Sequence, residues 1–419
     1  MLRQNVLFVL FLIALALVPA ACAGAAVPTA APPTSAAQPT SAAQPTTASQ
    51  PTTPTPPTSV PAGTSAPAAT SAPAATTASG AASGKPCPNP HGKDGKCRVV
   101  LVNSFLGNDY RVFMQQLGVK ASHHEPFASE WQELEILNTD NTAEAQNAGI
   151  ENLLAQGVDA ILLDAVSDTS ASDVVKKACD QGVVVVTFDI TDKAGAPCEY
   201  RIDFNFKEYN TVQGRWVAKK LNCQGNVIVD KGLQGVSVAG EMYDGWIEGM
   251  KEVCGDKIKV VATFYGQFGP GPLAQALPGL LASNPQIDAF LVDTTPAVVA
   301  KAFMDAGRPV PILASGYGND GAVACIQNNW TCHLTSTSWG PAIAAMETAY
   351  KVFHGQDVPK QQFWGITYYT TDPSIDVGVP QVKLELGKNA FPDKPASYTP
   401  SYNWPGATLQ ISEEEAYGK

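Results

Sequence analysis

Polar side chains stand at the ends of three apolar runs, where they could bind a polar small molecule. The runs VVLVN, AILLD and VVVVTFD end at or just before Ser104, Asp164 and Asp189. Near-continuous apolar runs of this length, separated by helical patterns, are typical of a parallel sheet that is covered on both faces. Ligands of such sheets bind outside the carboxyl ends of the strands, so these side chains predict a binding site there.

Other chemistries have less support in the residues. The segment GVSVAG (235–240) has one residue too many for a G-x-S-x-G nucleophile elbow. His123, His124, Glu125 and Glu130 could suggest a metal site, but adjacent residues on a helix point about 100° apart, which favours a solvated surface. No C-x-x-C pair occurs, so a zinc site is not expected. We therefore predict neither catalysis nor a metal or cofactor.

The elements that position the strand-end residues form two similar blocks. Strands and helices alternate from Arg98 to Asp189, and after a short strand the alternation begins again. Two successive parallel blocks predict an α/β fold of two doubly wound parallel-sheet lobes joined by a hinge. The clearest elements of the second block are three strands, a helix and a last strand FWGITYY, expected at 226–230, 259–264, 289–292, 341–353 and 363–369.

The lobes that this pattern predicts are discontinuous in the sequence, because the chain is expected to cross between them more than once. A Pro-, Tyr- and Lys-rich tail that follows them has no assigned role. The predicted parts are an N-terminal lobe of residues 97–204 plus 339–368, a C-terminal lobe of residues 205–338 plus 369–385, and a tail at 386–419.

The first residues have the pattern of an export signal. Arg3 precedes an apolar stretch, Val6–Val18, that is too short to span a membrane, and two alanines precede Cys22. Small residues before a cysteine resemble a bacterial lipobox, in which the cysteine becomes N-terminal and carries lipid. Residues 1–22 are therefore predicted to be a lipoprotein-type signal peptide with its cysteine, although Pro19 stands where the pattern usually has leucine. The alternative is a soluble secreted protein in which Cys22 is buried or paired.

A low-complexity segment follows this signal. Residues 23–84 consist almost entirely of Ala, Pro, Thr, Ser and Gln, which is too little apolar surface to offset the entropy of ordering. We predict that residues 23–96 are a disordered tether that holds an extracytoplasmic, lipid-anchored protein off the cell membrane; the alternative is a cell-wall or secretion linker. The formal net charge of −11 argues against a nucleic-acid partner.

The cysteine count fits an exported chain. Cys22 set aside, the nine cysteines leave an even number, which is compatible with disulfides as structural staples. Many connectivities are possible, and proximity in the sequence suggests the pairs Cys87–Cys97, Cys179–Cys198, Cys223–Cys254 and Cys325–Cys332.

Three segments together resemble the bacterial periplasmic sugar-binding proteins of the ribose-binding type, which are the substrate-binding proteins of ABC importers. They are VVLVNSFLGNDYR (99–111), the stretch from NTAEAQ to VVVVTFD (141–189) and IDAFLVDTTPAVVAKAFMDAG (287–307). The resemblance covers about residues 98–369. It implies the type I periplasmic binding fold, capture of a sugar by closure of two lobes, no catalysis, no cofactor, a membrane-embedded ABC permease as partner, and a monomer.

The resemblance also implies a set of ligand-binding residues. Ser104 and Asn108 fall where family members hydrogen-bond sugar hydroxyls, and Tyr110 falls on an aromatic residue that stacks against the sugar ring. Asp189 falls on a carboxylate that accepts from two hydroxyls. The other implied positions are a stacking aromatic of the second lobe, two polar residues, a strand-end residue and a hinge-side residue: Phe268, Asp293, Thr294, Tyr317 and Trp339.

The chain departs from the family pattern at two basic positions. Ile190 stands where an arginine often follows the strand-end aspartate, and Gly240–Met242 has no counterpart of a second-lobe arginine. Two charge-assisted donors are therefore missing. Arg111, which follows Tyr110 in the first loop, is the candidate to replace one of them. Ribose itself consequently does not follow from the resemblance.

Structural roles compete with these assignments. Asn108 and Asp189 could cap helices, Tyr110 and Trp339 could pack in the core, and Asp164 is expected to be a cap or turn residue. Two other functions also stay open. One is a receptor that presents a ligand to a membrane sensor, and the other is a secreted carbohydrate enzyme, which would need two carboxylates about 5–9.5 Å apart.

Overall fold

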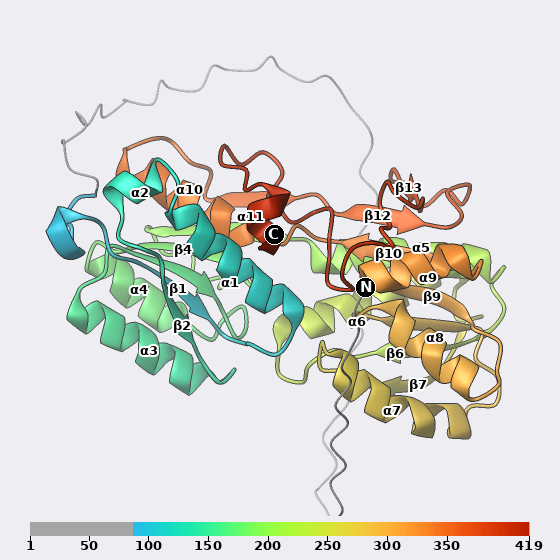
Figure 1. Ribbon diagram of the computed structural model, residues 1–419. Coiled ribbons are helices and arrows are strands. Elements are labelled where there is room, and N and C mark those ends of the chain that lie inside the picture. Colours follow the sequence, from blue (N-terminus) through green and yellow to red (C-terminus); the bar gives the residue numbers. More distant parts are fainter. Residues whose placement is uncertain (1–86, 419) are drawn as a thin grey trace, which may run out of the picture. The chain divides into compact units, whose positions relative to one another are not determined.

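The computed structural model describes residues 87–418, which form two sheets flanked by helices (Figure 1). The predicted signal peptide, Cys22 and the tether as far as residue 86 lie outside the described residues. The first sheet has the strand order β11-β5-β4-β3-β1-β2, and all its neighbours are parallel. Its strands are β1 (Val99–Asn103), β2 (Glu135–Asn138), β3 (Ala160–Asp164), β4 (Val184–Asp189), β5 (Glu199–Phe204) and β11 (Gln361–Trp364).

The second sheet has the order β13-β12-β10-β9-β8-β6-β7 and is parallel except where β12 meets β10. The predicted α/β fold of two doubly wound parallel-sheet lobes is thereby confirmed. The strands are β6 (Asn226–Asp230), β7 (Lys259–Phe264), β8 (Ala289–Val292), β9 (Ile312–Gly316), β10 (Cys332–Ser336), β12 (Thr367–Thr370) and β13 (Val382–Lys383).

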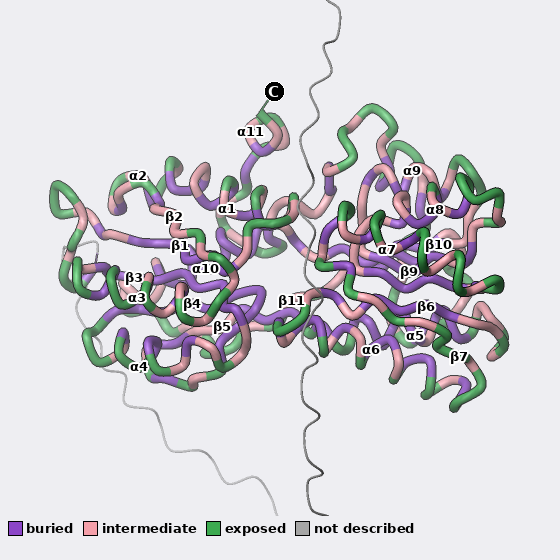
Figure 2. Tube along the Cα trace, turned by 90° about the horizontal axis from the view of Figure 1, so that it is seen from below, coloured by how far each residue is buried: buried purple, intermediate pink, exposed green. Residues whose placement is uncertain are grey.

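The central strands are buried along their whole length, as the tube in Figure 2 shows, because helices cover the sheets. Around the first sheet lie the 3₁₀ turn η1 (Lys93–Gly95), α1 (Asp109–Ser122), α2 (Phe127–Glu130), α3 (Ala143–Gln156), α4 (Ser172–Asp180), α10 (Pro341–Phe353) and α11 (Glu413–Tyr417). Around the second lie α5 (Phe206–Lys220), α6 (Ser237–Cys254), α7 (Pro270–Ser283), α8 (Pro296–Asp305) and α9 (Asn319–Gln327).

The chain passes from one sheet to the other at three places: between β5 and α5, between β10 and α10, and between β11 and β12. After β13 it returns once more to the first lobe, because α11 lies beside α1. The single strand expected at 363–369 is wrong, because its residues form β11 in the first sheet and β12 in the second. β11 pairs in parallel with β5, whereas β12 pairs antiparallel with β10. An apolar run predicts an extended backbone, but it does not say which sheet edge each half will join.

All four predicted disulfides are present, and each one joins cysteines that are close in the sequence: Cys87–Cys97, Cys179–Cys198, Cys223–Cys254 and Cys325–Cys332. Each therefore staples a local loop or helix end to its own lobe. Residues 87–96, placed in the tether by the sequence prediction, contact the first lobe. Cys87 is buried there, and His91 Nδ1 lies 2.8 Å from Asp159 Oδ1.

Two features are absent from the part of the chain that the structure describes. Residues 87–418 contain no helix that is both long and apolar enough to cross a membrane. Nor do these residues bring three or more His, Cys, Asp or Glu side chains together in a group that could hold a metal ion.

A buried histidine makes the second lobe sensitive to acid. His333 in β10 is completely buried beside Trp216, with ring centroids 5.1 Å apart. Burial lowers the pKa of His333 to about 3, and Gln381 opposes this effect. The unfolded chain, in which histidine has a pKa of about 6.5, therefore binds the proton more readily. Protonation favours unfolding, so this contribution to stability is lost as the pH falls from about 6.5 towards 3.

We expect the variant His333→Phe to lose less stability on acidification than the unmodified protein. Between pH 6.5 and 3 its free energy of unfolding should fall less steeply, by up to about 1.4 kcal/mol per pH unit. Urea unfolding at several pH values measures this difference, since every other titrating group is shared. Two parallel curves would contradict the assignment.

Candidate functional site

A cavity of about 350 Å³ lies between the lobes, at the carboxyl ends of the strands of both sheets. Its size is at the small end of ligand pockets, which span about 300–1,000 Å³. The structure brings together nearly all the residues predicted for ligand binding. Those that line the cavity are Asn108, Tyr110, Arg111, Asp189, Phe268, Asp293, Thr294, Tyr317 and Trp339.

Ser104 is the exception, because it is buried and does not line the cavity. Its backbone N–H donates to the carbonyl of Asp164 at 3.2 Å, which holds the residue against β3. The structure therefore does not support the prediction that Ser104 contacts the ligand. Ligand contacts are expected near the carboxyl ends of the strands. Which side chain there reaches the cavity depends on the path of the loop that follows the strand.

A buried ion cluster forms the first-lobe side of the site. Arg111 Nη2 lies 3.0 Å from Asp189 Oδ2, Nη1 pairs with Asp164, and Nη1 also donates to Asn103 Oδ1 at 3.1 Å. Asp164, expected to be a cap or turn residue, is thus an ion-pair partner. Burial raises the pKa of Asp189, and Arg111 opposes this. Burial and the charge of Asp189 likewise raise the pKa of Tyr110, whose hydroxyl stays protonated.

Two cavity residues hold an unusual backbone conformation. Asp189 has φ = 59° and Phe268 has φ = 53°, in the left-handed region that residues other than glycine rarely adopt. Such conformations cost free energy, and they concentrate at functional sites, where the surrounding structure maintains them. Here they direct one carboxylate and one aromatic ring, from opposite lobes, to the same cavity.

The start of α1 links the two lobes. Asn108 caps this helix, because its Oδ1 accepts from the Arg111 N–H at 2.9 Å. Its Nδ2 approaches the Phe268 carbonyl of the second lobe at 3.5 Å. The sequence leaves open whether Asn108 caps a helix or lines the cavity, and in the structure it does both.

A second carboxylate, that of Asp293, lines the cavity from the second lobe, and the charge of Asp230 acts on it. The backbone carbonyl of Asp293 accepts from the Gly316 N–H at 3.1 Å. Asp230 Oδ1 accepts from the N–H groups of Gly232 and Gly266 at 2.8 and 2.7 Å. Burial, together with the charges of Asp230 and Asp189, raises the pKa of Asp293 to about 7. Burial raises the pKa of Asp230 to about 6. Asp293 can therefore accept or donate a hydrogen bond near neutral pH.

Aromatic rings make up much of the remaining wall. Tyr110 and Trp339 meet edge to face with ring centroids 5.9 Å apart, so Trp339 is a cavity residue that also packs against its neighbours. Sequence reasoning missed several lining residues. Phe206 and Tyr209 follow the end of β5, and Thr335–Thr337 lie at the carboxyl end of β10, so the strand-end rule could have found them. Nothing in the sequence pointed to the tail residues that also line it, namely Ala396, Ser397 and Tyr398.

The comparisons with known proteins agree with this architecture. The family model described as "Periplasmic binding protein domain" matches residues 99–357. The ribose import binding protein RbsB of Bacillus subtilis is 26% identical over 231 residues, which are 54% of this chain and 73% of that protein. A D-ribose/D-allose-binding protein of Pseudomonas aeruginosa is 24% identical over 274 residues, 62% of this chain and 83% of that protein.

A solved structure is also similar. The ABC transporter solute binding protein from Thermobispora bispora has a TM-score of 0.60 at 29% identity, covering 65% of this chain and 84% of that chain. Together with the family match, this confirms the resemblance that the sequence segments indicated. The relatives are binding proteins, so a substrate-binding rather than catalytic role is supported.

The ion cluster around Arg111 should be important for stability. In Arg111→Met, Asp164 and Asp189 would lose their buried counter-charge, and breaking such a pair typically costs about 3–5 kcal/mol. Chemical denaturation measures this loss. Arg215→Met is the matched control, because Arg215 pairs with Glu252 at the surface, where ion pairs contribute about 0–1 kcal/mol. Equal stability of the two variants would contradict a structural role for the cluster.

Proposed function

The chain belongs to the periplasmic binding protein domain family, and from this premise we propose that it captures a sugar between its lobes and delivers it to the permease of an ABC importer. The names of its relatives support this ligand class, since they include ribose and allose binders and an import binding protein. The chain acts by binding, and any chemistry belongs to its partners.

The observation that carries the proposal is the combination of groups around one cavity. Asp189 and Asp293 offer carboxylates from opposite lobes, and Asn108 adds an amide. A sugar presents hydroxyls that both donate and accept, together with apolar C–H faces. The aromatic rings of Tyr110 and Phe268 offer flat surfaces for such faces. A closed cavity also penalises a wrong epimer, since an unpaired buried polar group costs about 1–3 kcal/mol.

We further propose where the protein works. Family membership supports an extracytoplasmic location. The export signal, lipidation at Cys22 and the Pro-rich tether remain sequence-based predictions, which together would keep a monomeric binding protein near a membrane-embedded permease. Lobe closure around a ligand is a known conformational repertoire, and three connections between the lobes are compatible with it.

A thermal-shift screen tests the ligand class. D-ribose, D-allose, D-galactose, D-fructose and L-arabinose are the probes, and at least one should raise the melting temperature by mass action. Asp189→Ala should abolish that shift, whereas Asp173→Ala, on the exposed face of α4, should leave it unchanged. A response to amino acids or nucleosides with none to any sugar would refute the proposal.

The pH dependence of binding should report on Asp293. As an ionised carboxylate it accepts bonds from sugar hydroxyls, so bound sugar favours the ionised form and lowers its pKa. Affinity is therefore expected to fall as the pH decreases from 8 to 5, through the free-protein pKa of about 7. Calorimetric titration at several pH values measures this trend, and Asp293→Asn should flatten it. If affinity instead rose on acidification, Asp293 would be a hydrogen-bond donor to the ligand.

A further inference from the structure

Residues 386–418, here called the tail segment, follow the last strand of the second sheet and lie beyond the family match, which ends at residue 357. The tail segment is first anchored to the second lobe by Asn319, at the start of α9. The Asn319 backbone N–H donates to the Ala396 carbonyl at 3.1 Å, and its side chain both donates to the Phe391 carbonyl and accepts from the Phe391 N–H, each at 2.8 Å. Asn319 is only 1% exposed, so this anchor is built into the fold.

The tail segment then passes along the ligand cavity. Ala396, Ser397 and Tyr398 line it. This segment holds two other lining residues. The Tyr317 hydroxyl donates to the Asn389 carbonyl at 2.6 Å, and the backbone N–H of Trp339 donates to the Ser401 carbonyl at 2.9 Å. The segment is therefore both a wall of the cavity and a support for two of its rings.

Beyond the cavity the tail segment packs on all three connections between the lobes. The ring of Trp404 lies 5.6 Å from that of Phe204 and 4.2 Å from that of Trp364, measured between centroids. Ser338 Oγ donates to the Asn403 carbonyl at 2.9 Å. Trp404 is only 1% exposed, so these contacts are packed tightly.

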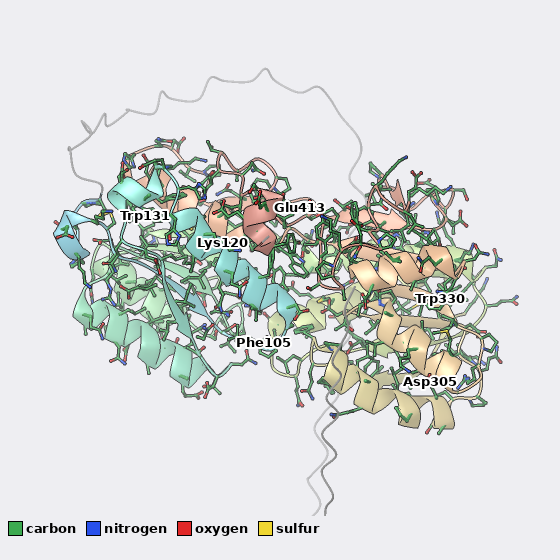
Figure 3. The ribbon with its side chains drawn as sticks, viewed as in Figure 1. Phe105, Lys120, Trp131, Asp305, Trp330 and Glu413 are labelled. Atoms are coloured by element: carbon green, nitrogen blue, oxygen red, sulfur yellow. A yellow bond between two sulfur atoms is a disulfide. The ribbon has the colours of Figure 1, made fainter. Side chains whose placement is uncertain are left out.

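The last part of the tail segment is anchored to the first lobe. Helix α11 lies beside α1, and Figure 3 shows Glu413 and Lys120 on these two helices. Lys120 Nζ donates to the carbonyls of Glu415 and Ala416 at 2.6 and 2.8 Å, and the Phe113 and Tyr417 rings are 4.8 Å apart. The segment thus binds both lobes, and separation of the lobes has to stretch or break one of its anchors.

We propose that the tail segment is a ligand-selecting wall of the cavity, which limits the site to a single sugar ring and excludes disaccharides and longer chains. The inference rests on the proposed sugar-binding function. Residues 396–398 form part of the cavity wall, so a ligand that carried a second sugar ring towards this wall would have to displace them. The anchors on both lobes keep this wall in place and limit how widely the lobes separate.

Calorimetric titration tests the wall. The probes are the five monosaccharides of the thermal-shift screen, with lactose and sucrose as the larger ligands. We expect a monosaccharide to bind and both disaccharides to bind at least 100-fold more weakly. Ser397→Trp should weaken monosaccharide binding at least tenfold, because the added ring enters the cavity. Asp393→Trp is the matched control: it changes an exposed residue of the same segment that does not line the cavity, so affinity should be unchanged.

A second variant tests the anchor without adding bulk to the cavity. Lys120→Met combined with Tyr417→Ala removes the bonds of Lys120 to α11 and the contact between the Phe113 and Tyr417 rings, and leaves the pair of His124 with Glu415 in place. The melting temperature checks that the protein folds. The rate constant for monosaccharide dissociation, measured by stopped-flow Trp fluorescence, should rise at least fivefold, and disaccharide affinity should increase. Lys176→Met, on the surface of α4, is the control.

The outcomes separate the inference from the function on which it rests. If a monosaccharide binds but Ser397→Trp binds it as well as the unmodified protein does, or if disaccharides bind as tightly as monosaccharides, the selecting wall is refuted and sugar binding stands. Unchanged dissociation in the anchor variant would also overturn the inference. If none of the sugars binds, the proposed function fails and the inference with it.

Discussion

The cavity depends on one buried guanidinium. Arg111 is the only Lys or Arg among the described residues that line it, and it neutralises Asp164 and Asp189 together. Two neighbouring buried carboxylates cannot easily both ionise without such a partner. Because Asn103 also bonds the same guanidinium, Arg111 is held in position and presents Asp189 to the cavity in a fixed orientation.

The two lobes therefore offer a ligand two different carboxylates. Asp189 is paired with a cation, whereas Asp293 faces other carboxylates and has a pKa raised to about 7. This asymmetry agrees with the two basic positions that the chain lacks relative to the family pattern, at Ile190 and in Gly240–Met242. A sugar hydroxyl can donate to the ionised carboxylate of Asp293, which is the form that we expect to bind it.

The hinge is the second place where distant parts of the chain depend on one another. Three connections join the lobes before the tail segment begins, and Trp404 of the tail segment packs on two of them through Phe204 and Trp364. The rings that line the cavity are linked to this region, since the Trp339 ring contacts Tyr110 and the Trp339 backbone N–H donates to the Ser401 carbonyl. Movement at the hinge and the shape of the cavity are thus physically connected.

The sequence by itself determined the elements whose signals are local. The expected strands at 226–230, 259–264 and 289–292 and the helix at 341–353 have the bounds that the structure shows, because periodicity and capping depend on near neighbours. The disulfide pairs could also be predicted from the sequence, since each joins cysteines that are close in it. Strand-end residues such as Asp189 and Asp293 were found because parallel strands bring their carboxyl ends to one edge.

Only the tertiary structure decided the features that depend on long-range contacts. It divided residues 363–369 between two sheets, because the choice of a sheet edge depends on strands more than 30 residues away in the sequence. Ser104 lies outside the cavity, where its backbone N–H donates to the carbonyl of Asp164 in the neighbouring strand. The tertiary structure also placed Ala396–Tyr398 in the cavity wall, since Asn319 and Lys120 anchor the tail segment from opposite lobes. No local pattern encodes these contacts, because each requires two distant segments to be folded first.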